Sequence, residues 1–132
     1  MHITNWLAVA GIATAMGVAT AINSTAADKP AKVLKHIVLY KFKDDLKPGQ
    51  VDEVVAAFAA LPKKIDTVIG FEHGTNVSGE GKSEGLTHSF VVTFTDEAGR
   101  ETYLKHRAHQ EYVNLVKDRR EKVIVFDYWA DR

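Results

Sequence analysis

Apolar and polar residues alternate along four stretches of the chain. A period of two is typical of strands whose side chains point to opposite faces of a sheet. The pattern predicts strands over residues 33–42, 67–77, 87–95 and 123–129. Gly70 and Gly74 interrupt the second of these strands, which predicts a bulge or a close approach of another backbone there.

Two further stretches follow a helical spacing instead. A stripe of apolar residues at three-to-four spacing predicts a helix with one buried face over residues 51–61, and Pro62 follows the stripe. The stripe consists of Val51, Val54, Val55, Phe58 and Leu61. Asp96 is a natural N-cap for a second helical region, whose apolar residues extend to Val116.

The order of these elements is strand, helix, strand, strand, helix, strand. That order is typical of the split βαβ arrangement, in which a four-stranded antiparallel sheet carries two helices on one face. We therefore predict one α+β domain, ferredoxin-like βαββαβ, over residues 33–129.

The first predicted strand is apolar on both faces. Leu34, Val38 and Tyr40 lie on one face, and Ile37 and Leu39 lie on the other. Because two helices cover only one face of a sheet, the second face needs a different cover, and a second copy of the same sheet is the simplest one. We predict a homodimer in which two sheets pack face to face as a dimeric α/β barrel.

The first 27 residues differ in composition from the rest of the chain. Residues 3–22 are uncharged and mostly apolar, and small residues follow at 24–27. This predicts a signal peptide over residues 1–27, cleaved after Ala26 or Ala27, and a periplasmic or secreted protein. No Lys or Arg precedes the apolar run, so an uncleaved membrane anchor and a mis-assigned start codon are the alternatives. Contact with a membrane is expected only if the segment is uncleaved.

Charge and cysteine content exclude several classes of function. The chain of 132 residues holds 17 Lys and Arg against 17 Asp and Glu, and this balance argues against nucleic acid as a partner. It contains no cysteine, which excludes disulfides, a thiol nucleophile and thiolate metal ligands.

Four segments together resemble the stress-responsive dimeric A/B barrel (Dabb) domain. They are residues 36–43 (HIVLYKFK), 87–94 (THSFVVTF), 103–109 (YLKHRAH) and 123–128 (VIVFDY). The resemblance implies a ferredoxin-like fold and a homodimer. One branch of the family contains cofactor-independent polyketide cyclases that perform an aldol condensation with a histidine and a tyrosine, and most members have no assigned activity.

The resemblance implies site residues by motif. The catalytic histidine of the cyclases falls on His109 and their catalytic tyrosine on Tyr103, while two further pocket histidines look similar to His36 and His88. A histidine can take a proton from a carbon next to a carbonyl, and a tyrosine hydroxyl can hydrogen-bond the developing enolate. Asp127 can orient an imidazole by accepting its N–H. A histidine in a strand is, however, more often a hydrogen-bonded core group than a reactive one.

The chain departs from the cyclase pattern at two positions. Phe58 stands where the cyclases have a pocket-lining tyrosine, so this binding position loses a hydroxyl. Arg107 stands where they have a proline between two histidines, which predicts a cation beside the pocket and the loss of a helix breaker. A cyclase-like substrate is therefore not implied, although a cavity between sheet and helices is.

Two hypotheses follow for function. In the first, which the sequence favours, an exported homodimer binds a small apolar or aromatic molecule without converting it. In the second, the protein is a cofactor-independent lyase or cyclase that uses His109 and Tyr103. The second requires both side chains to converge on one open pocket. Handling of haem rests on fold analogy alone.

We also considered a metal site. His106 and His109 lie three residues apart, a spacing that can hold a metal on one helical face. A third ligand would have to come from a distant residue such as His36, His88 or Asp127. We expect neither a metal nor another cofactor.

Overall fold

The computed structural model describes residue 11 and residues 31–132, so the predicted signal segment lies outside the described residues apart from Gly11. The elements, in chain order, are β1 (Lys32–Phe42), α1 (Gln50–Ala59), α2 (Leu61–Lys64), β2 (Val68–Thr75), β3 (His88–Phe94), α3 (Glu97–Lys105), α4 (Arg107–Val116) and β4 (Arg120–Asp131). In the described part of the chain, no helix has the length and apolar character needed to cross a membrane.

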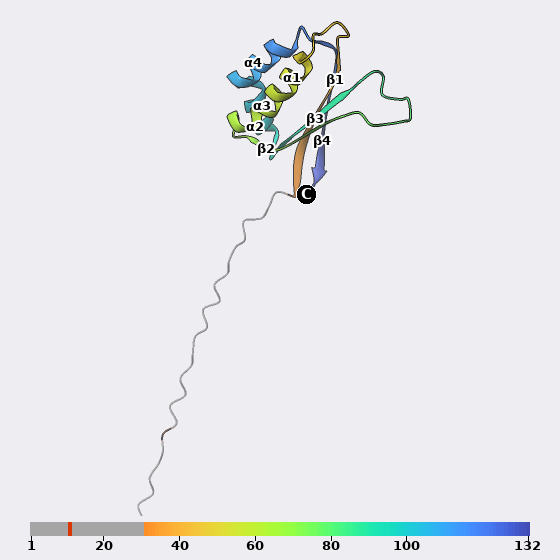
Figure 1. The fold of residues 1–132 in the computed structure, drawn as a ribbon. Coiled ribbons are helices and arrows are strands. Elements are labelled where there is room, and N and C mark those ends of the chain that lie inside the picture. Colours follow the sequence, from red (N-terminus) through yellow and green to blue (C-terminus); the bar gives the residue numbers. More distant parts are fainter. Residues whose placement is uncertain (1–10, 12–30) are drawn as a thin grey trace, which may run out of the picture.

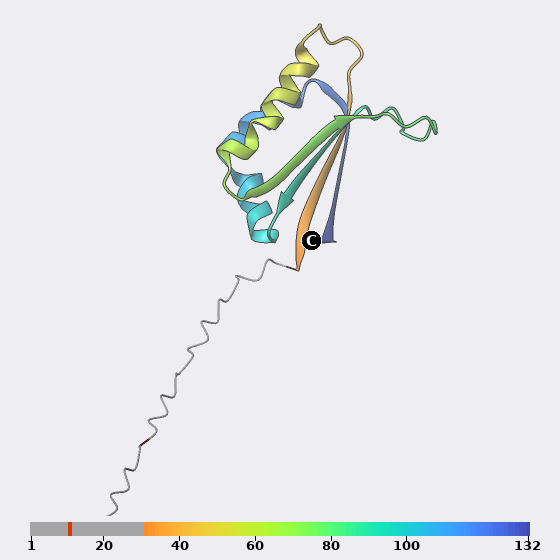
Figure 2. The same ribbon diagram turned by 60° about the horizontal axis from the view of Figure 1, so that its bottom comes forward.

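The four strands form one antiparallel sheet in the order β2-β3-β1-β4. The helices gather on one side of this sheet and leave the other side bare (Figures 1 and 2). The predicted ferredoxin-like βαββαβ fold is confirmed. β1 lies between β3 and β4, with β4 at one edge of the sheet.

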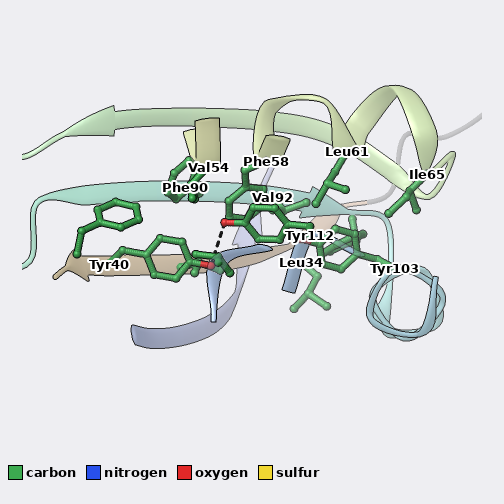
Figure 3. Close-up of a cluster of buried hydrophobic side chains, with 14 residues drawn as sticks. Leu34, Tyr40, Val54, Phe58, Leu61, Ile65, Phe90, Val92, Tyr103 and Tyr112 are labelled. Atoms are coloured by element: carbon green, nitrogen blue, oxygen red, sulfur yellow. Dashed lines mark hydrogen bonds between the residues drawn. The ribbon is translucent and has the colours of Figure 1, made fainter. Parts of the chain in front are cut away.

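A cluster of aromatic and aliphatic side chains fills the space between sheet and helices (Figure 3). Phe90 of β3 is 0% exposed and stacks on Phe58 of α1 with ring centroids 4.3 Å apart. Tyr40 packs against the same Phe90 ring at 5.6 Å. Burial of these large rings is the main stabilising term for a domain of this size.

The second strand contains the bulge that its glycines predict. The pairing register between β2 and β3 shifts between Val68 and Gly70. A Cβ atom added at Gly70 would lie 3.2 Å from the Thr93 side chain, a distance that forces the neighbour to move. Glycine therefore lets the two strands approach closely here without displacing Thr93.

Several predicted boundaries differ from the structure, and the differences at the first helix and the last strand have a physical reason. The first helix ends at Ala59, and Pro62 does not follow it but lies in the first turn of the short helix α2, where the missing N–H of proline has no cost. The last strand begins at Arg120 rather than at Val123. Charged residues at its start belong to the sheet because they continue the pairing with β1.

The second helical region is divided at His106. As predicted, Asp96 caps its start, with Oδ1 accepting the N–H of Gly99 at 2.8 Å. His106 has an extended backbone, and its Nδ1 accepts the N–H of Ala108 at 3.0 Å. Arg107 is not itself a helix breaker, yet the helical region is still divided here, because the His106 cap ends one helix and begins the next without a proline.

Candidate functional site

A cavity of about 330 Å³ lies where α3 and α4 meet the helix-facing side of β1 and β4. Its floor consists of three cross-strand pairs of β1 and β4: His36 with Asp127, Val38 with Val125, and Tyr40 with Val123. The helices do not fully cover the edge strand β4, so Val123 remains 37% exposed and Val125 55%. The cavity therefore opens to solvent along β4.

His109 and Tyr103 lie together in this cavity, with ring centroids 4.5 Å apart. They come from different helices, and the break at His106 brings them together. Nδ1 of His109 lies 3.2 Å from the carbonyl oxygen of Leu104. A carbonyl only accepts, so Nδ1 carries the proton and Nε2 of the neutral ring is free to accept one.

The surroundings of His109 favour its neutral form. Burial lowers the pKa of His109, the Leu104 carbonyl opposes that effect, and the nearby His36 adds to it. Near neutral pH the imidazole is therefore predominantly uncharged, which is the form that acts as a base.

Tyr103 is a protonated tyrosine in the lining of the same cavity, and it is only 1% exposed. Its side chain is buried, and burial raises its pKa far above the ordinary value for tyrosine. Among the residues that the structure describes, none accepts or donates a hydrogen bond to this hydroxyl. Within residues 31–132, Tyr103 is therefore a hydrogen-bond donor that has no acceptor.

A third group in the cavity is built around Asp127. One carboxylate oxygen accepts Nδ1–H of His36 at 2.7 Å, and the other accepts an N–H of Arg100 at 2.6 Å. The ring of His36 lies 6.0 Å from that of Tyr103. Asp127 therefore fixes the orientation of the His36 imidazole, with Nε2 on the opposite side of the ring.

The far end of the cavity contains three polar groups that the sequence analysis missed. Tyr112 of α4 donates a hydrogen bond to the hydroxyl of Tyr40 at 3.1 Å (Figure 3). The Arg120 guanidinium carbon lies 6.0 Å from the centre of the Tyr40 ring. Tyr40 lies on the same strand face as His36, and Tyr112 follows His109 by one helical turn. The periodicity of each element could therefore have predicted that these tyrosines lie near the two histidines.

The predicted binding residues do not all meet in this cavity. Phe58 lines it together with His36 and Asp127. His88 does not: it lies at the start of β3, its ring is 5.0 Å from that of Phe42, and it lines a separate depression under the β2–β3 loop. Burial lowers the pKa of His88, and a more distant Asp52 opposes that effect.

Arg107 and His106 have roles in the structure that differ from those that the sequence suggested. Arg107 does not extend a cation into the cavity; its side chain is 91% exposed and pairs with Glu111. His106 caps a helix with Nδ1, which separates it from His109. No group of three His, Asp or Glu side chains with the spacing of a metal site occurs among residues 31–132.

Comparison with known proteins places the chain among similar domains. A family model described as the stress responsive A/B barrel domain matches residues 34–130. The stress-response A/B barrel domain-containing protein HS1 of Arabidopsis thaliana is 34% identical over 95 residues, which cover 72% of this chain and 87% of that protein. Olivetolic acid cyclase of Cannabis sativa is 30% identical over 95 residues, covering 72% and 94%. A dimeric ferredoxin-like protein of unknown function from Jannaschia sp. CCS1 has a similar crystal structure, with a TM-score of 0.61, 29% identity and coverage of 73% and 97%.

Proposed function

The chain belongs to the stress responsive A/B barrel domain family, and we propose that it is a homodimer whose cavity binds a small apolar or aromatic molecule and moves a proton on it. The observation that supports proton transfer is the convergence of His109 and Tyr103 on one open cavity. An enzyme of this kind requires both side chains to line one open pocket. Olivetolic acid cyclase, a relative by sequence, is named for a cyclisation.

The proposed chemistry uses only side chains of the cavity. Nε2 of His109 takes a proton from a carbon next to a carbonyl group, and the Tyr103 hydroxyl donates a hydrogen bond to the oxygen of the resulting enolate. The enolate carbon then either attacks a second carbonyl, as in a cyclase, or accepts a proton. The imidazolium of His109 returns its proton to the new alkoxide or to the carbon, so the enzyme ends in its starting state.

Binding without conversion is the second candidate function. One group of lining residues favours it, because this group consists of apolar side chains that suit a small apolar or aromatic ligand. Its members are Val38, Phe58, Leu104, Val113 and Val125.

Exchange of hydrogen for deuterium separates the two functions. The probe is 1-phenylpropan-2-one in D₂O, whose CH₂ group is a carbon acid beside a ketone and an aromatic ring. An enzyme of the proposed kind accelerates exchange at this CH₂, measured by proton NMR, and a binding protein binds the probe without accelerating exchange. A probe that neither binds nor exchanges would contradict both functions.

The bare face of the sheet supports the homodimer. Phe126 of β4 is 61% exposed and Tyr128 is 42% exposed, and their β1 partners in the register are Ile37 and Lys35. Because side chains alternate along a strand, these pairs point away from the helix-facing pair of His36 and Asp127, toward the side of the sheet that carries no helix (Figure 2). Exposed aromatic residues on a flat sheet are typical of an interface. The similar Jannaschia protein is described as dimeric.

A charge placed on this face is expected to dissociate the dimer. We predict that the wild-type protein sediments as a dimer at micromolar concentration and that Phe126→Asp sediments as a monomer. Burial of an unpaired carboxylate in the interface should weaken association at least about a hundredfold. Ala98→Asp is the matched control, since Ala98 is exposed on α3, on the helix side. A wild-type protein found only as a compact monomer would refute the assembly.

Export is the remaining part of the proposal, and it rests on the composition of residues 1–27. We expect the mature protein, purified from its own host, to begin at Ala27 or Asp28. N-terminal sequencing together with native mass spectrometry checks the cleavage site, the oligomeric state and any retained ligand in one preparation. Recovery of Met1 on protein from the cytoplasm would contradict export.

A further inference from the structure

We propose that the ligand of this cavity carries a carboxylate, which Arg120 and the Tyr40–Tyr112 hydroxyl pair bind at the end of the cavity away from Asp127. This inference rests on the proposed binding function and specifies the class of its ligand: a small apolar acid. Its basis is a cation and a hydroxyl proton at the same end of the cavity, of which the cation has no carboxylate partner and the proton no acceptor among the described residues.

Arg120 is the cation. Two carboxylates line the cavity, and both have other partners: Asp127 binds His36 and Arg100, and Glu101 lies 3.4 Å from Lys105. Within residues 31–132 no carboxylate lies within ion-pair distance of the Arg120 guanidinium. A half-buried guanidinium without a counter-ion, in a partly enclosed cavity, attracts an anion.

The hydroxyl pair supplies a hydrogen-bond donor beside this cation. Tyr40 is 2% exposed and Tyr112 is 5% exposed, and the single hydrogen bond between them uses one of their two protons. Burial raises the pKa of both groups, so both keep their protons at neutral pH. The second proton has no acceptor among the described residues, and an oxygen of a bound anion would accept it.

The distance between the two ends of the cavity defines the shape of the ligand. Tyr40 follows His36 by four residues along β1, which is roughly 13 Å at the rise of a strand. The apolar pair of Val38 and Val125 lies between these two ends. A ligand that spans the cavity therefore has a carboxylate at the Arg120 end, an apolar middle, and the group that meets His109 at the other end.

Calorimetric titration with a matched pair of probes tests the inference. The probes are 4-phenylbutanoate and its neutral amide, 4-phenylbutanamide, at fixed ionic strength. We expect the wild-type protein to bind the acid at least about tenfold more tightly than the amide. In Arg120→Gln this preference should fall below about twofold while the affinity for the amide changes little. Tyr40→Phe should reduce the preference in the same direction.

Arg107→Gln is the matched control, because it removes an equal charge from an exposed position outside the cavity, and it should keep the preference. Equal binding of acid and amide by the wild-type protein would overturn the carboxylate inference and leave the proposed binding function intact. A preference that survives in Arg120→Gln but disappears in Arg100→Gln would also overturn it. Failure of both probes to bind would reject the binding function together with this inference.

Discussion

Replacement of His109 by alanine is expected to slow deuterium exchange into 1-phenylpropan-2-one at least about a hundredfold, the usual lower bound for a positioned acid or base. The substitution removes the Nε2 atom that accepts the proton. His109 is half-buried at the surface of the cavity, so its loss should leave the fold intact. The measurement is a paired assay of exchange rate and probe affinity on the wild type and the variant.

Tyr103→Phe is the companion variant. It deletes one hydroxyl and keeps the ring, which packs 5.2 Å from Phe94 and 4.5 Å from His109. The exchange rate should fall less than in His109→Ala, because the base remains. If the protein only binds, both changes should instead alter affinity by about 1 to 2 kcal/mol, the range of one lost hydrogen bond. If neither assay changes, neither residue faces the ligand, and the assigned roles are wrong.

The pH dependence of exchange gives an independent check on His109. Because burial lowers its pKa below the ordinary 6.5, the base stays neutral as the pH falls through 6.5 and is lost only at lower pH. The acid limb of the rate profile at low probe concentration should therefore have its midpoint below 6.5. In His109→Ala this limb should be absent. A midpoint above 6.5 would contradict the environment described for the residue.

The fold could be predicted from the sequence because its determinants are local. Alternation of apolar residues identified four strands, and the Asp96 cap identified the start of α3. The break at His106 could not be predicted in this way. It depends on a histidine side chain that caps Ala108, whereas the expectation rested on the absence of proline alone.

The same distinction applies to the candidate site: local motifs predicted some of its residues, and others depend on contacts between distant segments. Residues carried over by motif, such as His109 and Tyr103, do lie in one cavity. Arg120 was missed because the last strand was predicted to begin only at Val123, whereas the register of β4 against β1 brings Arg120 beside Tyr40. His88 was grouped with His36 because both resemble pocket histidines of the family, although the two line different cavities. Contacts between elements distant in the chain decide such cases.

Phe90→Ala is expected to destabilise the domain by about 3 to 5 kcal/mol, the range for truncation of a fully buried phenylalanine. Phe90 is 0% exposed at the centre of the sheet, and its ring contacts those of Phe58 and Tyr40. The cavity left by the lost ring cannot collapse easily, because the sheet and α1 fix its walls. Urea unfolding measures the change in the free energy of unfolding. All variants are compared at one protomer concentration, so that dissociation of the dimer contributes equally to each measurement.

Two comparisons make this prediction specific. Phe90→Leu keeps most of the buried volume and should cost clearly less than Phe90→Ala, and it remains measurable if the alanine variant fails to fold. Val77→Ala, at a position that is 93% exposed, should change the free energy of unfolding by less than about 0.5 kcal/mol. Phe90 stacks on Phe58, and Phe58 lines the cavity. Phe90→Leu should therefore also weaken binding of 4-phenylbutanamide, because it loosens the packing of Phe58. A Phe90→Ala variant within about 1 kcal/mol of wild type would show that the aromatic cluster is not the core of the domain.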